Sequence, residues 1–209
     1  MIGKSALAAA AALTLASCGI YRSMYAPPGE MGSNWRGVAT PADRDRLRRW
    51  HDAWDAALPA ARAADPDAIA QGGALFAPDR ALAGAMPPPG TYRCRTYKLG
   101  AAGPAAHDFI RFPWSECRVF FEDEVLGLHK LGGTQRPVGL LFRDRDARAI
   151  FLGTLVLGDE AAPLRYGTDT TRDMIGYVER VDDARWRLVL PWPRFESKLE
   201  VIELVPASE

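Results

Sequence analysis

Short apolar runs separated by polar turns fill the second half of the chain, from Pro87 onward. The runs are rich in Val, Ile, Leu and aromatic residues, and Gly, Pro or Asp punctuates them every ~8 to 15 residues. Many short strands with no helix between them are typical of an antiparallel sandwich or barrel. The pattern predicts strands near residues 91–98, 107–112, 114–121, 124–131, 137–142, 148–157, 174–181, 185–190 and 198–205.

One of these runs, AIFLGTLVLG at 149–158, covers most of the predicted strand 148–157 and is apolar on both faces. A strand with this composition is buried on both sides. We therefore expect a central strand with one side in the barrel interior and the other beneath the N-terminal helices.

A helical pattern precedes the strands. Thr40 is a good N-cap residue, and Pro41 follows it at the first helical position. An apolar stripe then recurs at steps of three and four residues, which predicts one buried helix face. Because such a stripe needs a partner surface, we expect the helix to pack on the sheet. The stripe consists of Leu47, Trp50, Trp54 and Leu58.

Two prolines set the expected helix boundaries. Pro59 predicts that the first helix ends near Leu58, because proline removes a backbone donor. Asp65-Pro66 predicts a shorter second helix that ends at Gly72-Gly73. The expected fold class is α+β, with short N-terminal helices (helical part 40–86) packed on an antiparallel β-barrel-like or sandwich domain (β part 90–206).

Cys94 and Cys117 are the two cysteines of the predicted domain. An even count in an oxidising compartment favours a disulfide over two free buried thiols. Closing a loop of roughly two dozen residues stabilises a fold by about 3 kcal/mol in the chain-entropy model. If Cys94 lies opposite Cys117 on paired strands, Arg95 lies opposite Glu116, which gives an opposite-charge contact.

The first residues have the order of a secretory signal: a positive start, an uncharged Ala- and Leu-rich run over 5–14, and a small-residue cleavage region. The apolar run is shorter than the ~20 residues that span a bilayer. Leu15-Ala16-Ser17-Cys18 resembles the lipobox of bacterial lipoproteins. The resemblance implies a signal peptide at 1–17 and acyl chains on Cys18; the alternative is an ordinary secretory signal.

Residues 18–33 lack periodicity and contain Pro27-Pro28-Gly29, so we interpret them as a lipidated tether before a single domain at 34–206. Gly19 follows the cysteine, where many lipoproteins retained in the inner membrane carry Asp. This resemblance favours the outer membrane, with the domain facing the periplasm.

The charge balance argues against a nucleic-acid partner. Lys and Arg number 26, and Asp and Glu also number 26. With no net positive field, nothing draws the chain to a polyanion over long range.

The mature chain also resembles the domain-of-unknown-function family 4893. The resembling stretches include PPPGTYRCRTYKLG, QRPVGLLF, FLGTLVLGDE and RWRLVLPWPRFESKLEVIELVP. The resemblance implies one exported domain of similar length. It assigns no activity and no catalytic residue to any position.

Motifs for catalysis or metal binding are missing from the sequence. His51, His107 and His129 have no metal-ligand spacing, so we expect no metal and no cofactor. No Gly-x-Ser-x-Gly elbow occurs. The candidate binding loop is a polar cluster in the most irregular stretch of the β half, where surface salt bridges are the plainer explanation. It comprises Tyr166, Asp169, Arg172, Asp173, Glu179 and Arg180.

Two functions fit these observations. The first is a non-catalytic binding or interaction module of the cell envelope, held to the membrane by its lipid, with an envelope protein, a glycan or a small apolar molecule as its ligand. The alternative is an envelope hydrolase that uses carboxylate residues. A buried Asp or Glu with a raised pKa at the mouth of a pocket would favour the hydrolase. A filled barrel would favour protein contact.

Overall fold

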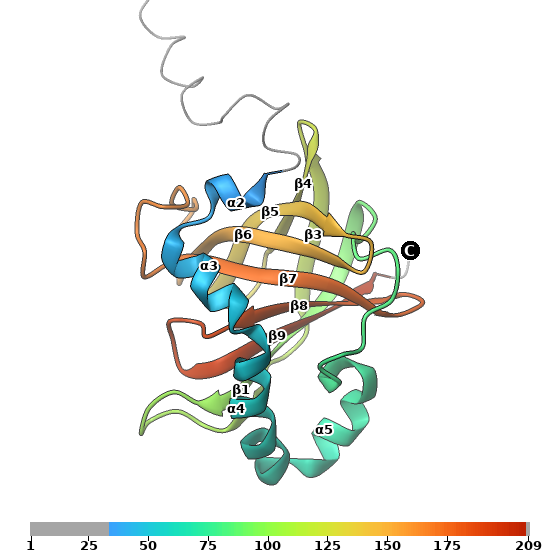
Figure 1. Ribbon diagram of the computed structural model, residues 1–209, viewed down its shortest axis with the longest axis vertical. Coiled ribbons are helices and arrows are strands. Elements are labelled where there is room, and N and C mark those ends of the chain that lie inside the picture. The colour runs from blue at the N-terminus through green and yellow to red at the C-terminus, as the bar shows by residue number, and fades with distance from the viewer. Residues whose placement is uncertain (1–33, 208–209) are drawn as a thin grey trace, which may run out of the picture.

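The computed structural model describes residues 34–207 (Figure 1). The predicted signal peptide 1–17, the tether 18–33 and the acyl acceptor Cys18 lie outside the described residues.

The β half forms one antiparallel sheet that closes on itself (Figure 1). Eight strands make the barrel, and closure comes from pairing of the first and last strands, β1 and β9. The short β2 pairs with the second half of β1 only. The strands are β1 (Gly90–Ala101), β2 (Phe109–Arg111), β3 (Ser115–Glu122), β4 (Val125–Lys130), β5 (Gln135–Arg145), β6 (Arg148–Leu157), β7 (Asp173–Asp182), β8 (Arg185–Pro191) and β9 (Ser197–Pro206).

Each predicted strand is present, and the α+β class is confirmed. The apolar run in β6 is buried at nearly every position. Phe151 and Leu155 from this strand contribute to the barrel interior, whereas Ile150 and Leu152 pack beneath the helices. The central strand therefore has the two-sided burial that its composition predicts.

Short helices cover one wall of the barrel (Figure 1). The Thr40 side chain caps the second of them by accepting a hydrogen bond from the Asp43 amide, as predicted. The Asp65 side chain caps a later helix in the same way. The helices are α2 (Trp35–Val38), α3 (Pro41–Arg48), α4 (Trp50–Ala64), α5 (Pro66–Gly72) and the 3-10 helix η2 (Gly73–Phe76).

The predicted helix end near Leu58 is wrong, because α4 continues through Pro59 to Ala64. Pro59 cannot donate to the carbonyl of Asp55, but Asp55 is exposed, so water can satisfy that carbonyl. Beyond the proline, Ala61 is fully buried in the core. Burial of this last turn offsets the cost of the proline, which a sequence pattern does not weigh.

The predicted apolar stripe packs on the barrel, as expected. Leu47 and Leu58 are buried, Trp54 is fully buried, and Trp50 is partly buried against the same cluster. The indole Nε1 of Trp54 donates to the Tyr177 hydroxyl at 2.8 Å. The helices and the outer face of the sheet thus share one core.

A second core fills the barrel interior, and glycines shape its wall. Gly139 and Gly153 face each other across β5 and β6. A Cβ on Gly139 would lie 2.3 Å from the Leu152 carbonyl oxygen, and one on Gly153 would lie 2.2 Å from that of Val138. The strands therefore approach this closely only where side chains are missing.

One end of the barrel is closed by the chain that leads into β1. Leu82 forms a bridge with Arg180, the Trp186 indole donates to the Gly84 carbonyl at 3.1 Å, and Ala85 joins the interior core. The opposite end carries the long loops, and we call it the mouth.

The disulfide between Cys94 and Cys117 forms, with a Cα–Cα distance of 5.7 Å. The predicted register is wrong by two residues: Cys94 pairs with Ser115, and Arg93 rather than Arg95 lies opposite Glu116. The faces are unchanged because side chains alternate with a period of two. The disulfide therefore bridges diagonal rather than directly opposite positions.

Candidate functional site at the barrel mouth

Four connections meet at the mouth, and each presents one large apolar side chain to solvent. They are the β1–β3 connection, which contains β2, and the β4–β5, β6–β7 and β8–β9 loops. Large apolar side chains exposed at one end of a domain are typical of an interaction surface. The four side chains are Phe112 (37% exposed), Leu131 (46%), Leu164 (40%) and Phe195 (37%).

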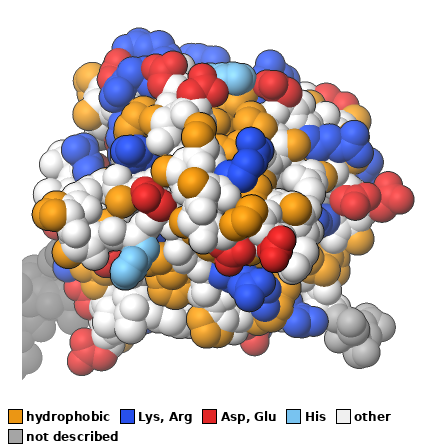
Figure 2. Space-filling view, turned by 90° about the horizontal axis from the view of Figure 1, so that it is seen from below, with side chains coloured by type: hydrophobic (Ala, Val, Ile, Leu, Met, Phe, Trp, Pro, Cys, Tyr) orange, Lys and Arg blue, Asp and Glu red, His pale blue; other side chains and the backbone are white. Residues whose placement is uncertain are grey.

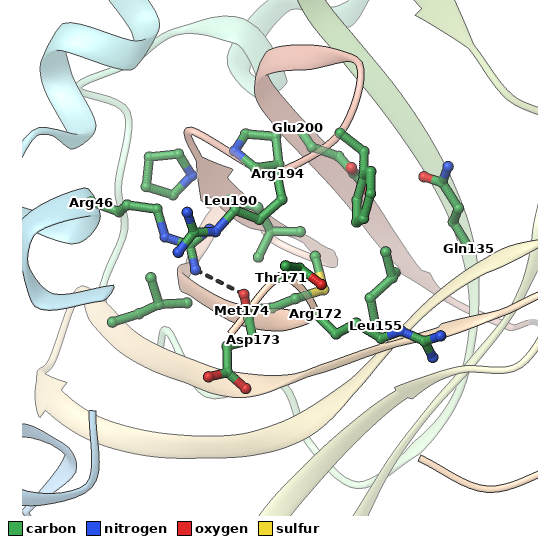
Figure 3. Close-up of a pocket in the computed structure, with 14 residues that line it drawn as sticks. Arg46, Gln135, Leu155, Thr171, Arg172, Asp173, Met174, Leu190, Arg194 and Glu200 are labelled. Atoms are coloured by element: carbon green, nitrogen blue, oxygen red, sulfur yellow. Dashed lines mark hydrogen bonds between the residues drawn. The ribbon is translucent and has the colours of Figure 1, made fainter. Parts of the chain in front are cut away.

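Beneath these loops lies a small cavity between β7, β8 and the barrel interior (Figure 3). It leaves about 20 Å³ for the centres of water molecules, which is room for about one water. Its lining combines apolar and charged groups, including Leu155, Leu190, Arg46, Asp173 and Glu200. This cavity at the mouth is therefore too small to be a deep ligand pocket.

A polar layer crosses the barrel interior next to this cavity. The Nζ of Lys98, on β1, donates at 2.7 Å to the side-chain oxygen of Gln135, on β5, and also bonds to the carboxylate of Glu196 in the β8–β9 loop. Only 2% of the Lys98 side chain is exposed. Lys130 lies in the same layer, where its ammonium donates to the carbonyl oxygens of Gly132 and Gln135.

Two carboxyl groups of this layer have pKa values shifted in opposite directions. The hydrogen bond from Lys98 lowers the pKa of Glu196. Burial raises the pKa of Glu200, although the positive charges of Lys98 and Lys130 oppose that shift. In many active sites, one carboxyl group with a raised pKa acts as the acid and another with an ordinary or lowered pKa acts as the base.

The β8–β9 loop, which carries Glu196, has a strained backbone. Trp192 (φ 49°) and Glu196 (φ 64°) both adopt the left-handed conformation, which non-glycine residues rarely occupy. Such residues persist only where the surrounding contacts hold them, and they cluster at binding sites. Here the Trp192 indole donates to the Arg49 carbonyl at 3.1 Å, and Lys98 holds Glu196.

A hydrogen-bonded wall joins helix α3 to the rim of the mouth. The guanidinium of Arg46 bonds to the Asp43 carboxylate, to the Asp173 carbonyl at 2.8 Å (dashed line in Figure 3) and to the Trp192 carbonyl at 3.3 Å. The Tyr166 hydroxyl donates to Asp43 and accepts from the Thr40 amide at 3.0 Å. Helix α3 therefore fixes two of the mouth loops.

Asp173 lies at the edge of this wall, and only one of its two carboxylate oxygens accepts a hydrogen bond. Its Oδ1 accepts from the Gly167 amide at 2.8 Å, whereas Oδ2 is buried without a partner in the described chain. Burial raises the pKa of Asp173. Asp173 and Glu200 are thus two carboxyl groups with raised pKa values on the lining of one cavity.

The structure divides the candidate binding loop predicted from the sequence. Tyr166, Asp169, Arg172 and Asp173 lie together at the mouth, where Arg172 pairs with Glu160 at 2.6 Å and lies 3.8 Å from Asp169. The other two predicted residues lie elsewhere: Glu179 is buried under the helices, and Arg180 lies near the closed end.

The polar layer inside the mouth was not among the site residues predicted from the sequence. Lys98, Gln135 and Glu200 occupy inward positions of strands whose other inward residues are mostly apolar. A charged residue at an inward position of an alternating strand is unusual, and this signal was present in YRCRTYKLG and KLEVIELV. The register of each strand was needed to use it.

Other kinds of site receive no support from the described chain. Residues 34–207 contain no group of three or more His, Cys, Asp or Glu side chains placed to hold a metal ion. None of the helices described is long and apolar enough to cross a membrane. The face shown in Figure 2 mixes basic, acidic and apolar side chains without one sign of charge predominating.

Comparison with known proteins gives one family. A family model described as Domain of unknown function (DUF4893) matches residues 35–204, so the resemblance noted from the sequence is confirmed. No curated protein and no solved structure matches the chain.

Proposed function

Because the chain belongs to the DUF4893 family, whose description assigns no activity, we propose a function from the barrel mouth and the N-terminal sequence. The protein is a lipid-anchored module of the cell envelope whose barrel mouth binds a partner protein without catalysis. The lipobox-like Leu15-Ala16-Ser17-Cys18 supports the anchor and export, and Gly19 supports the outer membrane, facing the periplasm.

The observation that carries the binding role is the set of exposed apolar side chains, one on each mouth loop. Space for about one water beneath them favours contact with a protein over enclosure of a small apolar ligand, since ligand pockets measure ~300 Å³ or more. Two of the four loops, β6–β7 and β8–β9, are anchored by hydrogen bonds to α3 and its N-cap, so these two loops are held in place before a partner binds.

Photo-crosslinking in intact cells tests the binding role. A photoreactive phenylalanine analogue at Phe195 should form a discrete adduct with one envelope protein. The matched control is Phe121, which is 63% exposed at the opposite end of the barrel. The adduct at Phe195 should weaken when Leu164 is replaced by Asp. Equal adducts at Phe195 and Phe121, or none at Phe195, would contradict a binding surface at the mouth.

Metabolic labelling with a clickable palmitate tests the anchor. The wild-type protein should be labelled, and Cys18→Ser should be unlabelled and either released or left as an uncut precursor. An unlabelled wild type, or a labelled Cys18→Ser variant, would show that the anchor is wrong.

The second candidate is an envelope hydrolase, favoured by the opposed pKa shifts of Glu196 and Glu200. In this role protonated Glu200 would donate a proton to the leaving group, while ionised Glu196 would take one from water. Purified peptidoglycan is the probe: soluble fragments released by the wild type and not by Glu200→Gln would support hydrolysis over binding alone. Equal release by both proteins would exclude this pair as the catalytic groups.

A further inference from the structure

A second surface, away from the mouth cavity, has the chemistry of an anion-binding groove. Helices α2 and α3 form one side of it and strands β5 and β6 the other, and it has a volume of about 350 Å³. Its apolar floor consists of Trp35, Leu47 and Ile150. Basic side chains rise around this floor: Arg36, Arg44, Arg48 and Arg148.

Most of these arginines have carboxylate partners, but the partners are shared. Asp45 pairs with both Arg48 and Arg49, each at 3.0 Å. Arg44 donates to the Arg36 carbonyl and pairs with no carboxylate in the part of the chain that the structure describes.

At the buried end of the groove, arginines again share a carboxylate. Glu179 pairs with both Arg148 and Arg187, while Asp144 pairs with Arg36 at 3.2 Å. Across the groove and its direct partners, five arginines therefore share three carboxylates, and Arg44 adds a sixth positive charge. The formal excess is three positive charges, although the whole chain is neutral.

The groove is also fixed in shape. The Trp35 indole donates to the Asp144 carboxylate at 3.1 Å, and the Arg36 guanidinium stacks over the Trp35 ring at 4.3 Å. Arg148 stacks on Trp50 at 4.2 Å. A guanidinium held in one plane loses less freedom when it binds a phosphate through two hydrogen bonds. A positive rim over an apolar floor fits a phosphate joined to an apolar group.

The groove lies next to the predicted tether, and this position indicates the source of such a phosphate. Trp35 follows the predicted tether 18–33 almost directly, and a coil of about fifteen residues has an end-to-end distance of about 20 Å. An acylated Cys18 would therefore hold this groove close to lipid headgroups. We infer that the groove binds the phosphates of anionic phospholipids in the membrane that carries the anchor. This inference rests on the proposed lipid anchor.

Vesicle binding tests the inference without the acyl chains. The mature chain 18–209 with Cys18→Ser should sediment with phosphatidylcholine vesicles that contain phosphatidylglycerol and stay in solution with phosphatidylcholine alone. Arg44→Ala with Arg48→Ala should weaken this binding about 30-fold, since each basic residue near an anionic surface contributes roughly a factor of five. Raising the salt concentration should weaken the wild type in the same direction.

The matched control is Arg111→Ala with Arg118→Ala, which removes two exposed arginines from β2 and β3. This variant should bind like the wild type. Equal losses in the two double variants would mean that only overall charge matters and would overturn the groove. Both variants should keep the wild-type unfolding midpoint, because the mutated side chains are not in the core.

Two further outcomes separate this inference from the anchor. Palmitate labelling of the wild type without binding of the unacylated protein to phosphatidylglycerol would overturn the groove and leave the anchor standing. Saturable binding of glycerol phosphate in solution, with no preference for phosphatidylglycerol vesicles, would overturn the membrane assignment in favour of a soluble anion.

Discussion

Two ionic clusters, one on the outer face of the barrel and one in its interior, differ in how completely their groups are hydrogen-bonded. On the outer face, Glu179 accepts hydrogen bonds from both Arg148 and Arg187. The Arg187 guanidinium, fully buried, also donates to a series of carbonyl oxygens that end η2 and the turn after it. These carbonyls belong to Ala74, Leu75, Ala77, Pro78 and Arg80.

The inner cluster at the mouth has a group without such partners. Lys98 bonds to Gln135 and Glu196, whereas the Glu200 carboxyl forms no ion pair within residues 34–207 and lies on the cavity lining with Asp173, whose Oδ2 is buried without a partner. A buried network in which each group is bonded holds a fold rigid, whereas a buried polar group left without a partner calls for another explanation. A buried charged group is therefore not by itself a sign of a functional site. A charged group that lacks hydrogen-bond partners and lies beside a cavity is a better indication.

The largest effect expected from this difference is the loss of Arg187. Arg187→Met should lower the free energy of unfolding by at least about 5 kcal/mol, because it removes one partner of buried Glu179 and leaves several carbonyls unbonded. Denaturant melts measure it, with exposed Arg118→Met as the control that should change little. A midpoint for Arg187→Met within experimental error of the wild type would show that the outer cluster is not structural.

Trp54 covers the same outer cluster, with the Arg187 guanidinium 5.2 Å from its ring. Trp54→Ala should cost about 3–5 kcal/mol, as for other buried aromatic residues. Trp54→Phe keeps most of the packing and loses the hydrogen bond to Tyr177, so it should cost about 1 kcal/mol. Both variants should unfold in one transition. Wild-type stability in Trp54→Ala would indicate that the helix stripe is a docking face for another protein.

Replacing a buried cation by Met in the inner cluster should lower the free energy of unfolding much less than it does in the outer cluster. Lys98→Met leaves Glu196, whose side chain is 52% exposed, free to bond with water. We expect a loss of about 2 kcal/mol, the net contribution of the two hydrogen bonds that Lys98 makes to Gln135 and Glu196. A loss as large as that of Arg187→Met would mean that the two clusters have the same structural role.

The smallest effect depends on pH. Burial in the folded state raises the pKa of Glu200. The protonated form of Glu200 therefore contributes fully to the free energy of unfolding below the unfolded pKa of ~4.3. This contribution is lost as the pH rises through the folded pKa. Glu200→Gln should therefore be more stable than the wild type at pH 8, and the difference should disappear near pH 3.5. Urea midpoints at both pH values check this. A variant less stable than the wild type at pH 8 would show that ionised Glu200 is stabilised by its lysine neighbours.

Local patterns in the sequence are enough to predict the strands and helix starts of this protein. Period-two alternation, turn residues and the Thr40 and Asp65 caps are local features, and the strands and helix starts that they predict are present. The Cys94–Cys117 disulfide is also present, as the even cysteine count and the expected oxidising compartment predict. These features depend on neighbours close in the chain, so a single sequence reveals them.

Tertiary structure decided everything that depends on distant partners. Closure of β1 on β9, the two-residue shift between β1 and β3, and the continuation of α4 past Pro59 each depend on packing between segments far apart in sequence. The candidate site does too. Lys98, Gln135 and Glu200 come from three strands and meet only when the barrel closes, whereas the neighbours Glu179 and Arg180 separate because adjacent residues of a strand point to opposite faces.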